Sequence, residues 1–412
     1  MEQVLYKLPD SWEWHSVKKL SHNIQYGHTA KAESNGNAKF LRITDIQDGK
    51  IDWQGVPTVS LEEKEISKYA LNDDDLIFAR SGATAGKSIL IKNAPKDAVF
   101  ASYLIRIVPN KKDIIPEYLS YFFLTPAYWE VVGQNAAGAA QPNINGTKLS
   151  EFIVPVAPQG EQKRIVEKLD ALLTRIDTAI EHLQQSVTLA DALYASELNE
   201  VFPSDADIES LSDKAGWVSL SDICTFENGD RGKNYPSKSA FVAEGIPVVS
   251  AGNLGERYID HKGLNYITPE RYDLLRSGRI KIGDILFCLR GSLGKVAISK
   301  DLDEGVIASS LVIIRPKACV SAEYIYKYLK SSLCQQFISF YNNGAAQPNL
   351  SAKSLGKFML PLPNADEQKI IIDGLDEKYQ HNQKLLDALR GKIDSLKILK
   401  ASILDSAFKG EL

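Results

Sequence analysis

Long apolar runs and a secretory leader are both missing from this sequence. No run approaches the roughly 18 apolar residues that a helix needs to cross a bilayer. The start, Met1-Glu2-Gln3, also lacks a basic segment followed by an apolar core. We therefore expect neither a membrane span nor a signal peptide, no membrane partner, and a cytoplasmic location.

Cysteine and histidine are both scarce. The 4 cysteines, Cys224, Cys288, Cys319 and Cys334, are widely spaced in the second half. This spacing argues against a disulfide framework and against a C-x-x-C metal site, so we expect all four to be small core residues. The 6 histidines show no H-E-x-x-H or comparable ligand spacing. We therefore expect no metal and no cofactor in this chain.

Catalytic motifs are missing as well. The sequence has no Gly-x-Ser-x-Gly nucleophile elbow and no Asn-Pro-Pro-Tyr-like tetrapeptide of the kind found in adenine methyltransferases. Asp73-Asp74-Asp75 is an acidic cluster that could be read as a metal site. Adjacent acids before a strand are more often a solvated turn, and only Asp284 persists at the corresponding place in the second half. The motifs therefore do not indicate an enzyme.

The chain also lacks a basic excess, since 48 Lys and Arg face 52 Asp and Glu and the net charge is -4. Residues 161–200 contain 4 basic and 8 acidic residues, a net of -4, and residues 366–412 contain 8 and 9, a net of -1. Subtracting this -5 from the total leaves +1 for the remainder. The acidity thus belongs to two segments, and DNA binding stays open although charge alone does not indicate it.

An internal duplication organises the chain. The sequence Gly-Ala-Ala-Gln-Pro-Asn begins at Gly138 and again at Gly344. From there to Asp170 and Asp376 the copies align at a constant offset of 206 without a gap, and 15 of the 33 aligned positions are identical. The 412 residues also exceed one domain of about 100 to 200 residues. We expect two similar globular units, each followed by a helix.

Strand and turn signals before the duplicated stretch are repeated too. In the first half, Asp75 to Arg80 and Ala98 to Val108 are typical of strands, and Pro116 to Phe123 of a helix start. The second half repeats this order from Gly283 to Tyr324. Between these anchors the two halves diverge, as expected when two similar modules read different targets. We therefore expect a mixed α/β fold with two similar α+β units.

Each unit leads into a segment with coiled-coil periodicity. Apolar residues follow three- and four-residue steps from Ile165 to Leu193 and from Leu375 to Ile403. About 40 helical residues extend about 60 Å. Because a whole unit separates the two helices, the simplest packing is one against the other, antiparallel. Asn382 falls on the seam, where it either fixes the register or is an end-of-helix polar residue at a loosely packed layer.

The segment from Gly82 to Ser88 looks like a phosphate-binding loop, because it ends in Gly-Lys-Ser. A P-loop has four residues between its first Gly and the Gly-Lys pair, whereas this segment has three, and the duplicate from Arg290 to Val296 has no hydroxyl for a metal ion. We interpret both as tight basic turns between strands. Candidate phosphate contacts there are Arg80, Lys87, Arg290 and Lys295, and a solvated turn explains them almost as well.

The loops that differ between the halves combine base-edge donors and acceptors with cationic side chains. The candidate DNA contacts are Tyr26, His28, Thr29, Lys31 and Arg42 in the first half, and Asn228, Asp230, Arg231, Lys233, Asn234, Tyr235 and Lys238 in the second. An ordinary soluble surface has similar loops.

The repeated Gln141, Asn143, Gln347 and Asn349 could bond bases, but their repetition beside Pro142 and Pro348 favours a structural role at the junction with each helix.

Four stretches together resemble the DNA specificity subunit of type I restriction-modification systems. They are Leu8 to Trp14 (Leu-Pro-Asp-Ser-Trp-Glu-Trp), the repeated Gly-Ala-Ala-Gln-Pro-Asn, Pro155 to Val166 with its Glu161-Gln162-Lys163 helix entry, and the tail from Leu399 to Leu412. The resemblance covers nearly the whole chain, including its duplication.

The resemblance implies target-recognition domains at 1–152 and 204–358, each reading one half of a split double-stranded DNA target, and spacer helices at 153–203 and 359–412. It also implies that the helices fix the distance between the half-sites and hold two methyltransferase subunits, with restriction subunits completing the complex. Adenine methylation and DNA cleavage would then belong to the partners, which would use S-adenosylmethionine, ATP and Mg²⁺. This chain would be non-catalytic and would hold no cofactor.

Two other classes of protein stay open on the residues alone. An autonomous enzyme, either a P-loop NTPase or a nuclease, predicts activity of the purified chain with ATP and magnesium. A coiled-coil scaffold without DNA readout predicts no salt-dependent duplex binding, even with partners present.

Overall fold

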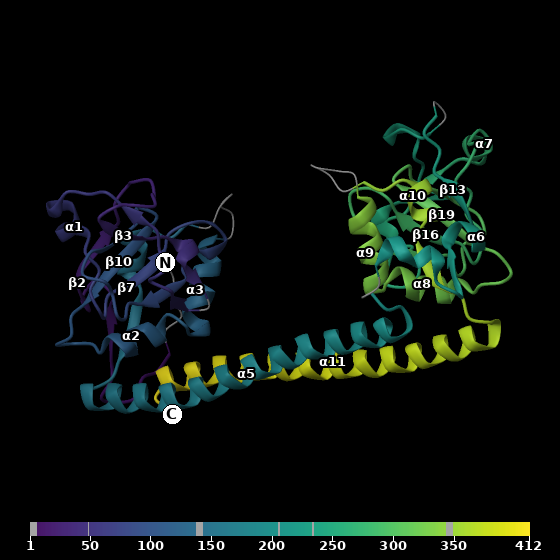
Figure 1. The fold of residues 1–412 in the computed structure, drawn as a ribbon. Coiled ribbons are helices and arrows are strands. Elements are labelled where there is room, and N and C mark those ends of the chain that lie inside the picture. Colours follow the sequence, from purple (N-terminus) through teal and green to yellow (C-terminus); the bar gives the residue numbers. More distant parts are fainter. Residues whose placement is uncertain (1–5, 48, 137–142, 205–206, 233–234, 343–348) are drawn as a thin grey trace. The chain divides into compact units, whose positions relative to one another are not determined.

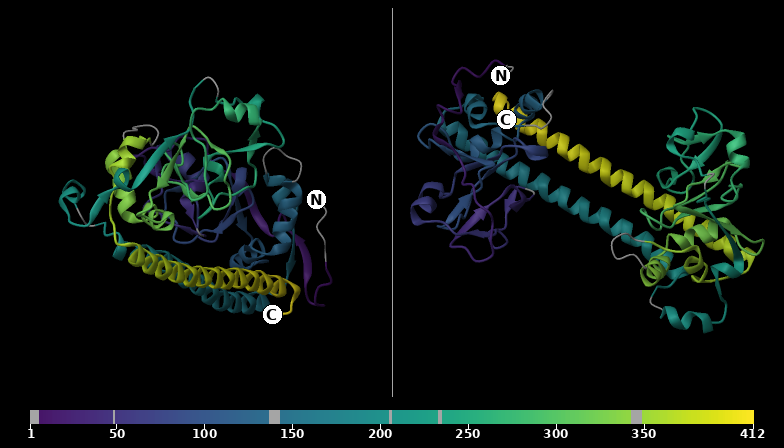
Figure 2. Two further views of the ribbon diagram at one scale, coloured as in Figure 1. Left: turned by 90° about the vertical axis from the view of Figure 1, so that its right-hand side faces the viewer. Right: turned by 90° about the horizontal axis from the view of Figure 1, so that it is seen from above.

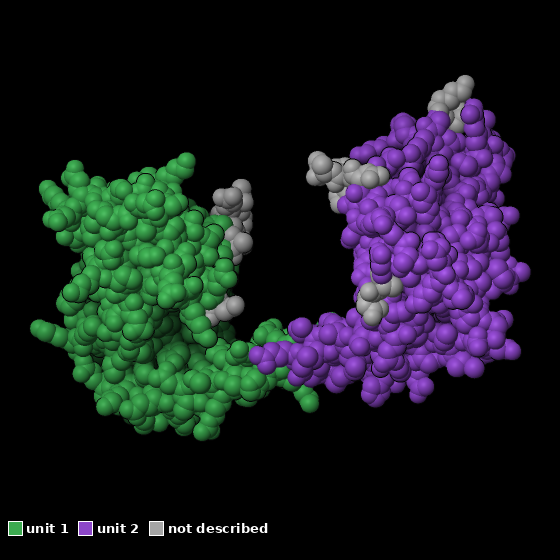
Figure 3. Space-filling view, in the orientation of Figure 1, with its two compact units in different colours: residues 1–184, 390–412 green, residues 185–389 purple. Residues whose placement is uncertain are grey.

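A computed structural model describes residues 6–47, 49–136, 143–204, 207–232, 235–342 and 349–412. The chain divides into two compact units (Figure 3). Unit 1 comprises residues 1–184 and 390–412, and unit 2 comprises residues 185–389. Within the described ranges, no helix is both long and apolar enough to cross a membrane.

The globular part of unit 1 contains β1 (Glu13–Ser16), β2 (Ser21–Tyr26), β3 (Ala38–Leu41), β4 (Ile46–Gln47), β5 (Lys50–Ile51), β6 (Thr58–Val59), α1 (Glu63–Tyr69), β7 (Leu76–Ala79), β8 (Ser88–Leu90), β9 (Ala98–Phe100), β10 (Leu104–Pro109), α2 (Pro116–Phe122), α3 (Pro126–Ala136), α4 (Gly146–Glu151) and β11 (Ile153–Val156). The globular part of unit 2 contains β12 (Trp217–Ser219), α6 (Leu220–Ile223), β13 (Cys224–Asn228), β14 (Ile246–Val249), β15 (Asn265–Ile267), α7 (Pro269–Asp273), β16 (Ile285–Cys288), β17 (Val296–Ile298), β18 (Val306–Ile307), β19 (Leu311–Pro316), α8 (Ala322–Leu329), α9 (Ser332–Tyr341), α10 (Ala352–Gly356) and β20 (Met359–Pro361). Two long helices, α5 (Gln159–Val201) and α11 (Ala365–Lys409), each contribute to both units. The mixed α/β fold that the sequence predicted is confirmed.

The main sheets recur in both units in the same strand order, and unit 1 also has β4 paired with β5. The four-stranded sheet runs β2-β10-β7-β8 in unit 1 and β13-β19-β16-β17 in unit 2. A three-stranded sheet runs β6-β3-β9 and β15-β14-β18, with the second and third strands parallel. The first strand pairs with the last, as β1-β11 and β12-β20. The duplication therefore extends beyond the aligned repeat to the main sheets of each globular unit.

The central strands of the four-stranded sheets are buried on both faces. In β7, Leu76 and Phe78 belong to the core that contains α2, whereas Ile77 belongs to the core on the opposite face. Successive side chains in a strand point to opposite faces, so a strand that is apolar throughout needs cover on both sides. In Figure 1, α2 and α8 lie on the side of each sheet nearest the long helices.

The repeated Glu-Gln-Lys sequence forms the joint between each unit and its long helix. The buried Gln162 side chain accepts a hydrogen bond from the Ile115 N–H at 2.8 Å and donates one to the Ala157 carbonyl at 2.8 Å. Gln368 in unit 2 accepts in the same way from the Ser321 N–H at 2.9 Å. Because a buried amide is costly without partners, these bonds fix the start of each helix against its unit.

Asn143 and Asn349 do not lie at that joint, so the prediction that they secure it is wrong. Asn143 pairs with Ser81 and Asn349 with Arg290, in the turns that follow β7 and β16. In unit 1, α4 and β11 intervene between Asn143 and α5. The same prediction for Gln141, Pro142, Gln347 and Pro348 concerns residues outside the described ranges.

Within each unit, α5 and α11 pack side by side in opposite directions, as predicted (Figures 1 and 2). In unit 1, Lys400 of α11 pairs with Asp177 of α5 at 2.6 Å. In unit 2, the Tyr194 ring of α5 contacts the Tyr379 ring of α11 at 5.1 Å between centroids. Residue numbers thus rise along α5 as they fall along α11.

Asn382 is buried in the middle of α11, so the end-of-helix interpretation is wrong and its place on the seam is confirmed.

The same aspartate of the repeat meets different partners in the two units. Asp376 forms ion pairs with Arg257 at 2.8 Å and with Lys327, whose side chain is 3% exposed. Burial alone would raise the pKa of Asp376, but these two cations hold it below its ordinary value. In unit 1, Asp170 instead accepts a hydrogen bond from the hydroxyl of Tyr121, which occupies the repeat position of Lys327.

Replacement of Asp376 by alanine is expected to destabilise unit 2 by about 3 kcal/mol, because Lys327 is left as a buried charge without its carboxylate. The matched variant Asp170→Ala removes a hydrogen bond to a neutral hydroxyl and should cost about 1 kcal/mol. Urea unfolding of the full chain, with hydrogen exchange to assign the loss to one unit, measures both. Equal losses for the two variants would contradict this account of the network.

Two predictions from single residue types need correction. Asp75 is buried and lies 3.6 Å from the Arg106 guanidinium, so a solvated turn does not describe it. Cys319 is exposed and is therefore not a core residue, whereas Cys224, Cys288 and Cys334 are buried as predicted. Among the described residues, no group of three or more His, Cys, Asp or Glu is placed to hold a metal ion.

Candidate nucleic-acid interface

Strands β2 and β13 end at the same place in the two units. Each is followed by a glycine, Gly27 or Gly229, that packs so closely on the segment after β9 or β18 that a Cβ would collide with a backbone carbonyl. Glycine is therefore required there in both units. The residue before the glycine is fixed in an equivalent position but differs, being Tyr26 in unit 1 and Asn228 in unit 2.

The segment from Gly82 to Ser88 connects β7 to β8, which pair as antiparallel neighbours. Gly82 and Gly86 have φ values of 80° and 88°, which glycine adopts at low cost. A phosphate-binding loop leads into a helix N-terminus, whereas here Ser88 begins a strand. The interpretation as a tight turn between strands is confirmed.

Hydrogen bonds place Arg80 and Leu289 at equivalent positions before the two glycine turns. The Ile144 N–H donates to the Arg80 carbonyl at 2.8 Å, and the Leu350 N–H donates to the Leu289 carbonyl at 3.0 Å. The next residue is a serine in unit 1 and Arg290 in unit 2. The arginine that accompanies the turn is therefore shifted by one residue between the units.

In unit 1, an aromatic side chain occupies the corner between the end of β2, the glycine turn and α4. The Arg80 guanidinium lies 5.2 Å from the centroid of the Tyr26 ring, a cation–π contact. The Tyr26 hydroxyl accepts a hydrogen bond from the Gly146 N–H at 2.7 Å. Tyr26 remains 41% exposed, so one face of this arrangement is open to solvent.

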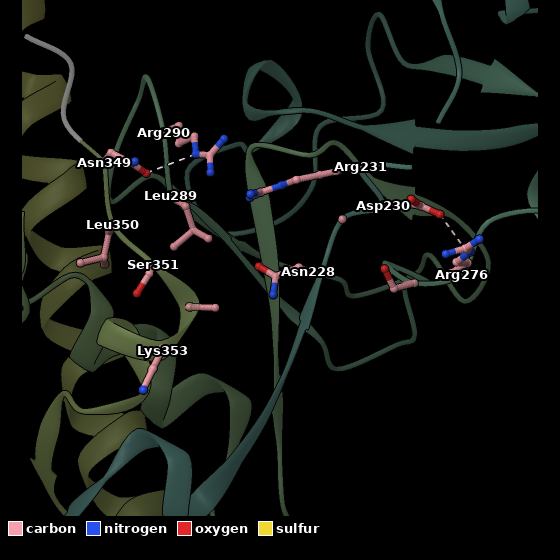
Figure 4. Close-up of a pocket in the computed structure, with 13 residues that line it drawn as sticks. Asn228, Asp230, Arg231, Arg276, Leu289, Arg290, Asn349, Leu350, Ser351 and Lys353 are labelled. Atoms are coloured by element: carbon pink, nitrogen blue, oxygen red, sulfur yellow. Dashed lines mark hydrogen bonds between the residues drawn. The ribbon is translucent and has the colours of Figure 1, made fainter. Parts of the chain in front are cut away.

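In unit 2, the corresponding corner is a cavity of about 590 Å³ (Figure 4). Its lining comes from the end of β13, the turn at Arg276, the glycine turn at Arg290 and the start of α10 at Lys353. Figure 4 shows Arg290 and Lys353 on one side of the opening and Arg276 on the other. Asn228 and Leu289, which line the cavity, stand where unit 1 has a tyrosine and an arginine.

The cavity lining is strongly cationic. The described lining residues include four cationic ones, Arg231, Arg276, Arg290 and Lys353, and one acidic one, Asp230, for a formal charge of +3. The Asp230 carboxylate accepts hydrogen bonds from the backbone N–H groups of Arg276 at 2.9 Å and Gly232 at 2.6 Å, and these bonds hold the pKa of Asp230 below its ordinary value. Asp230 therefore shapes the loop.

The arginines of the cavity keep most of their donors available. Within the part of the chain that the structure describes, Arg231 donates one hydrogen bond, to the Ser309 carbonyl at 3.1 Å, and Arg290 donates one to the Asn349 side chain at 3.2 Å. A guanidinium carries five N–H donors. Both side chains are exposed, so each is held in place by one bond while its other donors can reach a ligand.

Three other predicted contact residues are engaged within the protein. His28 is hydrogen-bonded to Glu65 at 3.1 Å. Arg42 donates two hydrogen bonds to the Asp45 carboxylate, at 2.7 and 3.1 Å, and these bonds raise the pKa of Arg42. Lys295 donates to the backbone carbonyl of residue 251 at 2.9 Å. The structure therefore gives each of them a local role that does not need DNA.

The remaining candidates are spread over the surfaces of the two units. Thr29, Lys31, Lys87 and Lys238 are exposed, Tyr235 is half-buried, and Lys233 and Asn234 lie outside the described ranges. Of the described residues among them, neither Tyr235 nor Lys238 of unit 2 lines the cavity.

Arg276 and Lys353 line the cavity but escaped the reading of the sequence. Arg276 lies in a divergent loop 45 residues after Arg231. Lys353 lies inside the aligned repeat, opposite Thr147 of unit 1. The lysine in place of a threonine at this repeat position could have identified Lys353 from the sequence, because a change from a neutral to a cationic residue between the copies indicates a difference in ligand contacts.

Comparison with known proteins gives consistent similarities. Residues 17–189 and 214–393 match the family model for the type I restriction modification DNA specificity domain. The putative type I restriction enzyme MjaX specificity subunit of Methanocaldococcus jannaschii is 25% identical over 431 residues, which cover 95% of this chain and 93% of that protein. The type I restriction enzyme EcoKI specificity subunit of Escherichia coli K12 is 24% identical over 433 residues, which cover 98% of this chain and 90% of that protein.

A solved structure has a similar fold. This structure concerns complex assembly and conformational transition of the type I R-M system. One of its chains matches the present chain with a TM-score of 0.74 at 21% identity. The match covers 99% of this chain and 100% of that chain. The duplicated arrangement of sheets and long helices is therefore shared with a known structure.

Proposed function

The chain belongs to the type I restriction modification DNA specificity family, and from this premise we propose that its two units each recognise one half of a split double-stranded DNA target. The chain is a specificity subunit that serves DNA target recognition. The observation that carries the proposal is the repetition of one scaffold with different side chains at the same corner, Tyr26 and Arg80 in unit 1 and Asn228 and Leu289 in unit 2. One scaffold with two different surfaces suits two different half-sites.

Within this proposal, the candidate residues other than Asp230 divide by their surroundings. Tyr26, Arg80, Asn228, Arg231 and Arg290 gather at the corner between β2 or β13 and the glycine turn, and they are the favoured DNA contacts. Thr29, Lys31, Lys87, Tyr235 and Lys238, with Lys233 and Asn234, would extend the contact surface. His28, Arg42 and Lys295 would act by positioning neighbours. Arginine and asparagine suit both phosphates and base edges.

We assign target recognition to residues 1–152 and 204–358, and spacing and assembly to residues 153–203 and 359–412. Methyltransferase subunits would dock on the long helices. In unit 2, these helices expose Leu189 (70% exposed), Leu193 (57%) and Leu385 (43%), and Leu193 and Leu385 line a groove of about 440 Å³. Apolar side chains exposed along a helix pair favour a helical partner.

In this assembly the present chain would contribute no catalytic group. The methyltransferase subunits would bind S-adenosylmethionine and methylate adenine, and restriction subunits would use ATP and Mg²⁺. The purified chain alone would then show neither ATPase nor nuclease activity, which separates this proposal from an autonomous enzyme.

Sequencing of adenine methylation in the host tests the proposed function. With the gene for this chain present, we expect methylation within one sequence made of two short specific parts separated by a fixed gap. Deletion of the gene, with the methyltransferase gene intact, should abolish methylation at that sequence. Unchanged methylation after deletion would contradict the proposal, and complementation by the wild-type gene is the control.

A further inference from the structure

We propose that the cationic cavity of unit 2 binds one phosphate of the DNA backbone, with Arg231, Arg290 and Lys353 as its contacts and Arg276 at its edge. This inference rests on the proposed function, because the phosphate belongs to the half-site that unit 2 reads. It adds Arg276 and Lys353 to the residues that position DNA, and it gives the two units different modes of contact at the same corner.

The charge of the cavity selects an anion. The four cationic side chains come from four separate segments that line one opening, while the carboxylate of Asp230 accepts hydrogen bonds from backbone N–H groups. A phosphodiester accepts hydrogen bonds from several donors at once, and arginine suits it because its planar fork can donate two parallel bonds. Arginine donors also suit the guanine edge, but a base carries no charge, whereas a lining with a formal charge of +3 is matched by the negative charge of a phosphate.

Two lining residues of the cavity differ from their counterparts in unit 1: Asn228 stands at the position of Tyr26, and Leu289 at that of Arg80. The Tyr26 hydroxyl of unit 1 reaches the N–H of Gly146, and the repeat position of Gly146 is Ala352, which lines the cavity. A tyrosine at position 228 would therefore extend across the cavity toward the N–H of Ala352. In unit 1 a Cβ added to Gly146 would lie 3.4 Å from the Tyr26 hydroxyl, an ordinary contact. The substitution Asn228→Tyr thus fits beside Ala352.

Variants taken from unit 1 test the inference with little risk to the fold. Lys353→Thr installs the residue that unit 1 has at this repeat position, and Asn228→Tyr installs the residue that fills the corner. Lys262→Thr is the matched control, because Lys262 is an exposed lysine of unit 2 that does not line the cavity. The full chain is assembled with its methyltransferase subunits, and binding to duplexes carrying the methylated sequence is measured over a series of salt concentrations.

The expected result is a loss that does not depend on sequence. Lys353→Thr should weaken binding about tenfold, both to the cognate duplex and to a duplex with the second half-site scrambled. It should also reduce the slope of the logarithm of the binding constant against the logarithm of the salt concentration by about 1. Asn228→Tyr should do the same, and Lys262→Thr should do neither. Duplexes in which a single backbone phosphate is replaced by an uncharged methylphosphonate locate the contact. At one position near the second half-site, this replacement should weaken DNA binding by the wild-type complex about tenfold and leave binding by the Lys353→Thr complex unchanged.

Four outcomes would overturn the inference. If the Lys353→Thr and Asn228→Tyr complexes bind DNA as tightly as the Lys262→Thr complex, the cavity does not hold a phosphate. A changed methylated sequence in Lys353→Thr would show that the cavity reads a base. Binding of ATP by the wild type but not by Lys353→Thr, with DNA binding unchanged, would show a free nucleotide site. Absence of salt-dependent duplex binding by the wild-type complex would overturn the proposed function as well.

Discussion

A four-residue insertion near Leu183 in α5, matched by one near Arg390 in α11, is expected to lengthen the gap between the two half-sites by about two base pairs. Four helical residues add about 6 Å, and one base pair spans about 3.4 Å. Four residues also turn a helix about 40° beyond one full turn. The two recognised half-sites themselves should stay unchanged, because no residue of the globular units is altered.

Both helices need the insertion because they are paired within each unit. Asp177 of α5 contacts Lys400 of α11 in unit 1, and Tyr194 contacts Tyr379 in unit 2. An insertion near Leu183 alone shifts these pairs by four positions relative to one another, so its effect on the gap should come with a loss of stability. Replacing four residues near Leu183 by alanine, without an insertion, is the control. A gap that stays unchanged after the double insertion would show that the helices do not set it.

The repeat predicted the architecture because the duplicated residues are those that hold the fold together. Gln162 and Gln368 lie in the aligned stretch, and each is buried with its amide bonded to the loop before α2 or α8. Residues with such tertiary roles recur in both copies, so the alignment of the copies outlines the scaffold. The coiled-coil spacing predicted the helix pair for a similar reason, since one apolar stripe must face another.

The details of the interface could not be predicted, because they depend on segments that meet only after folding. The cavity of unit 2 brings together Arg231, Arg276 and Lys353 from three distant parts of the chain. Asp376 lies in the aligned repeat, yet its partner Arg257 comes from a divergent loop. His28 looked like a DNA contact because its sequence neighbours are polar, and the Glu65 that engages it is 37 residues away.

Exchange of residues 20–150 for the corresponding segment of a relative that reads another target is expected to replace one half-site completely. This segment carries the Tyr26 and Arg80 corner, and its ends lie before β2 and near the end of α4. The Gln162 joint uses the backbone N–H of Ile115, which any residue except proline supplies, so the exchange keeps this bond. The gap and the other half-site should therefore stay as they were. The reciprocal exchange of residues 222–356 should replace the second half-site and leave the first.

Sequencing of methylated adenines in a host that carries the first of these exchanges tests the central claim most directly. The account predicts a methylated sequence in which one half comes from the relative, the other half is that of the wild-type chain, and the gap between them is the same length. A change in both halves, or in neither, would contradict the assignment of one half-site to each unit.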